Sequence, residues 1–217
     1  MGAMLVMVKC MKIVSPKISK YLEEVKLDSA MINNDLVDIK ITDQDIDFKI
    51  ENIEFNGCYF INVDFSKYPL KNISLIDCIF EKCNLSGSDF SDIGIHRVRF
   101  DRCNMVGCDF ISSSLSNVSI LETKGNYINF SNSKISHFEI VNSVVKEGRF
   151  VACSLEDVSF EEIDFERTEF LNTKLKGLDF CSCNINDIGV SPNDIRGVNV
   201  NDEQALMLIS LFGIIIK

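Results

Sequence analysis

The sequence predicts a solenoid, in which the chain winds into stacked coils, and two observations lead to that prediction. First, thirty residues from Phe55 to Val200 have numbers divisible by five, and all of them except Gly125 are large and apolar. Second, the residue two places earlier is mostly small or β-branched, and polar residues fill the gaps. Neither a helix, with a period of about 3.6, nor a strand, with a period of about two, produces a strict five. A short fixed period indicates units that bury their apolar faces only by stacking on their neighbours.

Most of the Phe and Cys residues lie in these two columns. Thirteen of the sixteen Phe lie in the first column, which predicts an axis filled by aromatic rings. The structural core residues chosen from this column are Phe80, Phe90, Phe100, Phe110, Phe160, Phe170 and Phe180.

Seven of the nine Cys lie in the second column, where a free thiol behaves as a small hydrophobe. Zinc is the alternative, because Cys78/Cys83 and Cys103/Cys108 have a spacing that some zinc sites use. That spacing is the repeat period itself, and no His shares the column. We therefore predict no metal and no cofactor.

The stretch from Cys78 to Phe90 carries a family resemblance. It reads Cys-Ile-Phe-Glu-Lys-Cys-Asn-Leu-Ser-Gly-Ser-Asp-Phe and resembles the pentapeptide-repeat family, whose units combine a small residue, Asp or Asn, Leu or Phe, and two polar residues. The resemblance implies an all-β fold, a right-handed quadrilateral β-helix in which four repeats make one square coil. The large residue and the small one two places earlier would point inward, and the other three outward.

The repeat divides the chain into three parts. Residues 1–30 are expected to be an irregular N-terminal lead-in, of which 1–10 are a tag or extension because Met11 offers a natural start. Residues 31–200 form the β-helix, with an atypical first coil, as is usual for terminal repeats. At Gly125 we expect a loosened corner or slight kink and no long loop, because the register resumes at Phe130 without a shift.

Residues 201–217 leave the repeat and predict a short helix with a tail. Asn201 and Gln204 have the spacing of a capping box. The helix is apolar on nearly two faces, so one face would cap the last coil and the other would meet a second copy. The predicted dimer interface comprises Ala205, Leu206, Leu208, Ile209, Leu211, Phe212, Ile214 and Ile216.

The C-terminal part of the chain points to one subfamily within this family. The stretches 174–180, 191–197 and 203–214, together with 95–104, are similar to the Qnr/MfpA-like quinolone-resistance subfamily. This resemblance implies a dimer that binds DNA gyrase or topoisomerase IV by presenting carboxylates where DNA presents phosphates. Several Qnr proteins carry projecting loops that aid drug protection, and the unbroken count from 50 to 200 leaves no room for them. Protection from quinolones and simple inhibition of the topoisomerase therefore both stay open.

The formal charge of −10 argues against direct binding to nucleic acid or to an anionic membrane. It favours a basic partner. The candidate topoisomerase-binding acidic surface comprises Glu156, Asp157, Glu161, Glu162, Asp164, Glu166 and Glu169, which would wrap around the rod. A solvated acidic face is the structural alternative. The basic residues Arg97, Arg99 and Arg102 interrupt the acidic rod and are expected to form local ion pairs.

The sequence predicts no enzyme. His96 and His137 occupy outward positions with no nucleophile beside them, and no phosphate-binding motif occurs. A structural or scaffold repeat protein with an unrelated partner is the alternative function. The absence of a signal peptide and of a long apolar run, with nine Cys, predicts a cytoplasmic protein.

Overall fold

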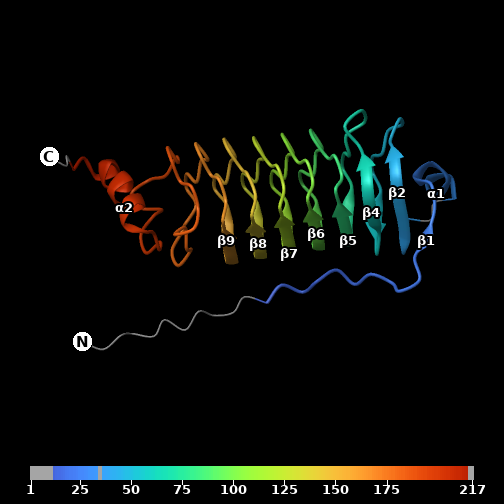
Figure 1. Ribbon diagram of the computed structural model, residues 1–217, viewed down its shortest axis with the longest axis horizontal. Helices are drawn as coiled ribbons and strands as arrows, with labels where there is room; N and C mark the ends of the chain where they lie inside the picture. Colours follow the sequence, from blue (N-terminus) through green and yellow to red (C-terminus); the bar gives the residue numbers. More distant parts are fainter. Residues whose placement is uncertain (1–11, 34–35, 215–217) are drawn as a thin grey trace.

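The computed structural model describes residues 12–33 and 36–214, and these residues form a rod of stacked coils (Figure 1). The strands are β1 (Glu23–Glu24), β2 (Ile39–Asp45), β3 (Glu54–Asn56), β4 (Tyr59–Asp64), β5 (Ser74–Glu81), β6 (Gly94–Asp101), β7 (Ser114–Leu121), β8 (Lys134–Val141) and β9 (Ser154–Glu161). The helices are α1 (Leu27–Asn33) and α2 (Asp202–Ile209), and a 3-10 turn covers Ser210–Phe212. All strand pairs are parallel, and the fold is a mainly β solenoid with a short C-terminal helix, as predicted.

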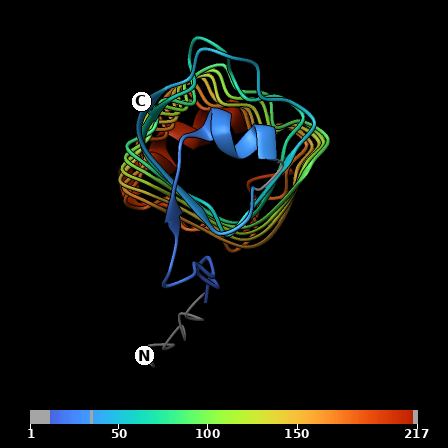
Figure 2. The same cartoon turned by 90° about the vertical axis from the view of Figure 1, so that its right-hand side faces the viewer.

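From β3 onward the strands repeat every twenty residues, whereas β2 pairs with β4 at an interval of nineteen, as for Ile41 and Phe60. Leu75 pairs with Ile95, and Ile95 pairs with Leu115, so each core residue lies under the residue twenty positions later. Strands β5 to β9 each cover two sides of the coil, and isolated bridges such as Asn104↔Lys124 and Asp109↔Asn129 mark the other two sides. Seen along the axis, the coils superimpose on one four-sided outline (Figure 2).

Most corners lie two residues after a core residue and use left-handed backbone; Lys67, Ser182 and Pro192 are exceptions. Asp77, Arg97 and Asn117 have φ values of 52°, 52° and 57° at successive corners of one column. Among residues 12–33 and 36–214, thirteen of the twenty-four non-glycine residues in this conformation are Asn or Asp, which tolerate it best. The Asn and Asp residues between the apolar columns therefore suit the turns, although Tyr127 and Ala152 occupy equivalent corners.

Phenylalanine rings fill the axis. The centroids of Phe90 and Phe110 lie 4.9 Å apart in a stacked arrangement, and Phe130 and Phe150 continue the stack with a spacing of 4.8 Å. All seven phenylalanines chosen as core from the sequence are buried. Because these rings occupy the interior, function must lie on the outside of the rod or at its ends.

The second inward column supplies hydrogen bonds as well as bulk. The Cys108 thiol donates to the Leu85 carbonyl at 3.1 Å, and the Thr168 hydroxyl donates to the Val145 carbonyl at 2.6 Å. Burial raises the pKa of Cys108 to about 12, which keeps this thiol protonated and able to donate. The expectation that these Cys act only as small hydrophobes is therefore incomplete.

The coil at Gly125 shows neither a loop nor a kink. The Gly125 amide donates to the Val144 carbonyl at 2.7 Å, and Lys124 bridges the strands on both sides. The buried side chain of Ile128 packs beside this position, since a Cβ at 125 would be in ordinary contact with its Cδ1 at 3.7 Å. The missing core residue is replaced from the neighbouring column, so the kink expected from the sequence is not needed.

One corner deviates from the regular stacking, although the five-residue period of the sequence continues through it unchanged. Lys71 bridges to Asp89, eighteen positions later, although the next corners still stack at Asn52, Asn72 and Asp92. Pro69, which has no amide hydrogen, lies in this corner, and Leu70 stays fully buried behind it. The rod therefore carries a small protruding corner without losing its count.

The structure also differs from the predicted irregular lead-in over the described residues 12–30, whereas residues 1–11, which include the predicted tag or extension, lie outside the described part of the chain. Strand β1 pairs with β2, and α1 starts at Leu27 and lies across the N-terminal end of the coils (Figure 2). Leu27 and Ala30 are buried there. Among the described residues, no helix is long and apolar enough to cross a membrane.

Candidate functional site

The seven residues of the predicted acidic surface encircle the rod near its C-terminal third. Glu156 and Asp157 lie on β9, Glu161 is the last residue of β9, and Glu162 forms the next corner with φ of 54°. Asp164, Glu166 and Glu169 follow on the next two sides. Their electrostatic environments divide this set in two.

Asp164, Glu166 and Glu169 are paired with cations of the preceding coil. The Lys146 ammonium lies 2.9 Å from Asp164 and 2.7 Å from Glu166, and Arg149 lies 3.3 Å from Glu169. The side chain of Asn184, one coil later, donates to Asp164 at 2.8 Å. This half of the surface is locally neutralised.

The pKa values agree with that pairing. Hydrogen bonding to Lys146 lowers the pKa of Glu166 and, together with the Asp164 contact, raises the pKa of Lys146. Burial of Asp164 acts to raise its pKa, but hydrogen bonds from Lys146 and from the Glu166 amide outweigh burial and lower it. These carboxylates are ionised and already engaged at neutral pH.

Glu156, Glu161 and Glu162 form the other half and are called here the open carboxylates. All three side chains are exposed, and within the described chain none of them has an ion pair. Asp157, beside them, lies 3.7 Å from the His137 ring. The open carboxylates present negative charge that the rod itself does not neutralise.

The predicted basic group is mostly paired. Arg97 makes two hydrogen bonds of 2.6 Å to the Asp77 carboxylate, and Arg102 contacts Glu81 at 2.7 Å and Asp101 at 2.8 Å. Arg99 differs from both because its Nε is buried without a hydrogen-bond acceptor among the described residues. Local ion pairing, as expected from the sequence, therefore accounts for two of the three arginines.

The C-terminal helix α2 starts with the predicted capping box. The Asn201 side chain accepts from the Gln204 amide at 3.0 Å, and the Gln204 side chain accepts from the Asn201 amide at 2.9 Å. Gln204 is also buried, and its Nε2 donates to the carbonyls of Phe180 and Cys183, both at 2.8 Å. The helix thus covers the last coil, and the buried polar side chain of Gln204 hydrogen-bonds to it.

The outer face of α2 is apolar and exposed. The exposed fraction is 56% for Leu206, 41% for Met207, 38% for Leu211 and 53% for Ile214. Leu208 differs from these because it packs against the core of its own rod. Of the residues predicted for the dimer interface, Ala205, Leu206, Leu211 and Ile214 are exposed, whereas Leu208 and Ile209 are half-buried.

The extent of this face also depends on the tail of the chain and on Met207. Ile216 and the side chain of Phe212 lie outside the described part of the chain. Met207 lies on the same exposed apolar face, although the residues predicted for the interface do not include it. Its place beside Leu206 in the sequence was the available signal.

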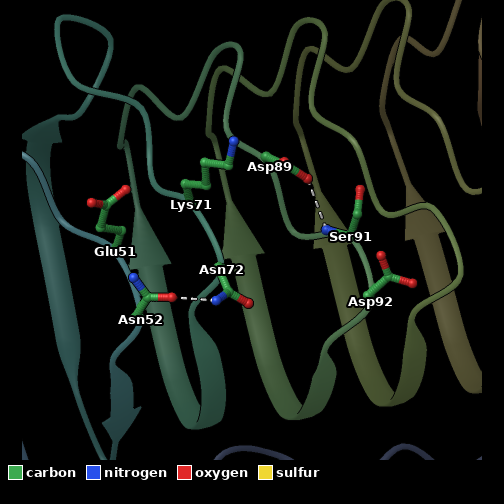
Figure 3. A pocket seen from close by; sticks show the side chains of 7 residues that line it. All are labelled: Glu51, Asn52, Lys71, Asn72, Asp89, Ser91 and Asp92. Atoms are coloured by element: carbon green, nitrogen blue, oxygen red, sulfur yellow. Dashed lines mark hydrogen bonds between the residues drawn. The ribbon is translucent and has the colours of Figure 1, made fainter.

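The hollows on the described surface are shallow gaps between outward side chains. The one in Figure 3, of about 420 Å³, lies near the protruding corner, and its lining residues are Glu51, Asn52, Lys71, Asn72, Asp89, Ser91 and Asp92. The Asn72 side chain bonds to Asn52, and Asp89 accepts from the Ser91 amide at 3.0 Å (Figure 3). No group of three or more Asp, Glu, His or Cys among residues 12–33 and 36–214 is arranged to hold a metal ion.

Coils of four five-residue sides with an aromatic axis define the class of protein as a quadrilateral β-solenoid. A model of a pentapeptide repeat region matches residues 73–150, and a model of pentapeptide repeats in eight copies matches 53–92 and 149–187, so the matches together cover 53–187. The chain belongs to the pentapeptide-repeat family.

Individual relatives are distant. One solved structure, of QnrB1, a plasmid-mediated fluoroquinolone resistance protein, is 20% identical with a TM-score of 0.32, covering 83% of this chain and 99% of that one. Another, of HetL, a pentapeptide-repeat protein involved in heterocyst differentiation regulation in the cyanobacterium Nostoc sp., is 10% identical with a TM-score of 0.24, covering 76% and 86%. A search of the curated proteins finds no match.

Proposed function

We propose that this protein binds a type II topoisomerase, DNA gyrase or topoisomerase IV, as a dimer whose carboxylates occupy a DNA-binding surface of the enzyme. In this proposal it acts by occupancy and shape, without turnover. The observation that carries the proposal is the set of open carboxylates, Glu156, Glu161 and Glu162, on a rod with an aromatic axis. The resemblance of the chain's end to the Qnr/MfpA-like subfamily supports this choice of partner.

The charge distribution favours a partner with a basic surface. A carboxylate that is already paired gains little from a second cation, whereas an exposed unpaired one can replace a phosphate and steer association. On this ground Glu156, Glu161 and Glu162 are proposed as the contact residues. Asp164, Glu166 and Glu169 are proposed to maintain the local structure.

The exposed face of α2 supports the dimer. Leu206, Met207, Leu211 and Ile214 make an apolar surface at the end of the rod, where a two-fold axis would join two copies end to end. The two acidic surfaces would then lie on both sides of the dimer centre. A DNA-binding surface that is itself two-fold symmetric would meet both copies.

The test is a DNA supercoiling assay with purified gyrase, run with and without ciprofloxacin. We expect the full-length protein either to inhibit supercoiling or to reduce drug-stabilised cleavage. The outcome also distinguishes inhibition from protection. No effect on either reaction at micromolar protein would contradict topoisomerase binding and would favour a scaffold with another partner.

A charge-reversal variant identifies the surface. Replacing Glu156, Glu161 and Glu162 by Lys should weaken the effect at least tenfold, because three favourable contacts become repulsive. The matched control replaces Asp45, Asp47 and Glu51 by Lys, an equal change of charge at exposed positions near the N-terminal end. Equal loss in both variants would indicate net charge alone and would exclude a defined contact surface.

A further inference from the structure

A segment far from the C-terminal helix occupies the outside of the rod. Residues 12–22, called here the strap, run in an extended path along the coils before the chain enters β1 (Figure 1). The Lys17 amide donates to the Asp77 carboxylate at 2.8 Å, and the Val14 amide donates to the Asn117 side-chain oxygen at 3.0 Å. The strap therefore crosses at least three coils of the rod.

The two anchors belong to one column of corners. Asp77, Arg97 and Asn117 follow one another at intervals of twenty residues, and all have left-handed backbone. Asp77 and Asn117 are two coils apart, which corresponds to about 9.6 Å at the usual strand spacing. Three residues of a polyproline II chain, the step from Val14 to Lys17, span about 9.3 Å and bring both amides to the same side, whereas in a β-strand they would face opposite sides. The corner thus offers acceptors at the spacing of every third amide of an extended chain.

Contacts within the column hold the Asp77 acceptor in position. Arg97 bonds to both oxygens of Asp77 and fixes the direction of the carboxylate. Burial of Asp77 acts to raise its pKa, but the hydrogen bonds from Arg97 and from the Lys17 amide outweigh burial and lower it. The two hydrogen bonds from Arg97 are made within the rod and therefore hold the acceptor at the first anchor independently of the strap.

The strap is attached more weakly than any coil. In the part of the chain that the structure describes, no backbone group of residues 12–22 bonds to a backbone group of the rod. Its Ile13, Pro16 and Ile18 are only half-buried, and Lys12, Val14 and Lys17 are exposed. A segment with few buried contacts and no ladder opens at low cost while the rod stays folded.

From this arrangement we propose that the Asp77–Asn117 corner is a docking site for an extended peptide of a partner protein, and that the strap is an intramolecular ligand that leaves before the partner binds. The strap shows what fits: amide donors three residues apart, apolar side chains between and beside them, and lysine at exposed positions. The class of partner is thus a protein with an extended, basic and apolar segment. The proposal does not depend on topoisomerase binding.

The probe for the test is a fluorescent peptide with the sequence of residues 12–22. The receptor is the full-length chain carrying Val14→Pro and Lys17→Pro, which removes both amide donors from the strap and leaves the rod unchanged. We expect the peptide to bind this variant in an anisotropy titration. Binding to the wild-type chain should be at least tenfold weaker, because the tethered strap competes at a millimolar effective concentration.

Two controls distinguish docking at the corner from adhesion elsewhere. A peptide N-methylated at Val14 and Lys17 should bind at least tenfold more weakly than the unmodified peptide. In the receptor, Asn117→Gly keeps the left-handed corner but removes the acceptor, and it should weaken binding about three- to tenfold, as expected for one hydrogen bond. Asn132→Gly, at a corner of another column, should leave binding unchanged, and thermal melting confirms that each receptor is folded.

Several results would overturn the proposal. The first is no binding of the peptide to the proline variant, and the second is equal binding to the variant and to the wild-type chain. A third is equal affinity of the N-methylated and unmodified peptides. Asn117→Gly and Asn132→Gly receptors that bind alike would exclude the corner as the site.

Discussion

The two ends of the rod are both covered by a short helix, but the helices present different outer faces. At the N-terminal end, α1 buries Leu27 and Ala30 and exposes Asp28 and Ser29. At the C-terminal end, α2 buries Gln204 and exposes Leu206 and Met207. An end with a polar outer face resembles a capped solenoid end, whereas the exposed apolar outer face of α2 is the surface proposed to meet a second copy.

The two ends can also be compared by how hydrogen bonds are made at the outermost coil. A solenoid leaves the backbone groups of its final coil without partners, and such groups are costly when they are covered. Gln204 satisfies two carbonyls directly, and at the other end the Leu27 amide is bonded to Gln44 at 3.0 Å. Both ends therefore combine closure of the core with hydrogen bonding, and only the outer faces differ in polarity.

Leu27→Asp should have the largest effect on this comparison. Leu27 is fully buried, so the variant places a charge against the first coil, and we expect a loss of about 4 kcal/mol or more in unfolding free energy. Because repeat coils depend on their neighbours, unfolding should begin at the N-terminal coils. Urea denaturation followed by circular dichroism measures the loss. Ser29→Asp, on the exposed side of α1, is the control and should cost little.

Gln204→Ala should be the next largest change. It leaves the carbonyls of Phe180 and Cys183 without donors and removes half of the capping box, for a loss of about 2 to 4 kcal/mol. Glu203→Ala, at the neighbouring exposed position, should change stability by less than about 0.5 kcal/mol. A loss no larger than that of Glu203→Ala would mean that the hydrogen bonds of the Gln204 side chain contribute little to stability.

Leu206→Asp combined with Leu211→Asp tests whether the apolar face of α2 is an interface. Both side chains point away from the rod, so the fold should persist while the dissociation constant of the dimer rises at least tenfold, about 1.4 kcal/mol. Sedimentation velocity over a range of concentrations measures the association. Leu208→Asp is less informative, because Leu208 packs on its own core. Val37→Asp, at an exposed apolar position near the N-terminal end, is the control and should leave association unchanged.

The fold could be predicted from the sequence because its period is strict and its inward residues are chemically distinct. Phe90 and Phe110 occupy equivalent places in adjacent coils, and no other register would bury both. The capping box at Asn201 and Gln204 was predicted for a similar reason, since it depends on two residues three positions apart. Such local and periodic features are independent of the rest of the structure.

The parts that escaped prediction depend on contacts between distant residues. The strap is fixed by Lys17 on Asp77, sixty positions away, and α1 has only seven residues, too few for a periodic signal. The predicted acidic surface was a cluster in sequence, but Lys146 neutralises Glu166 from the coil below. Only the three-dimensional stacking separates the open carboxylates from the paired ones.

Acid pH should have the smallest effect on the unfolding free energy. It compares one carboxylate in each half of the rod. Each half has a carboxylate whose pKa is lowered in the folded protein, Asp77 through Arg97 and Asp164 through Lys146. A lowered folded pKa means that the stabilisation is complete above the unfolded value, near 3.8, and is lost as the pH falls through the folded pKa.

Asp77 should contribute more to this loss than Asp164, because its side chain is 9% exposed and that of Asp164 is 28% exposed. We expect Asp77→Asn to remove about 1 kcal/mol or less of the acid-dependent loss and Asp164→Asn to remove less. Urea midpoints measured at pH 7, 5 and 3 for the wild type and both variants test this order. The reverse order would show that the more exposed pair is the stronger one. In that case Arg97 would serve to direct the Asp77 carboxylate toward the strap and would add little to the stability of the rod.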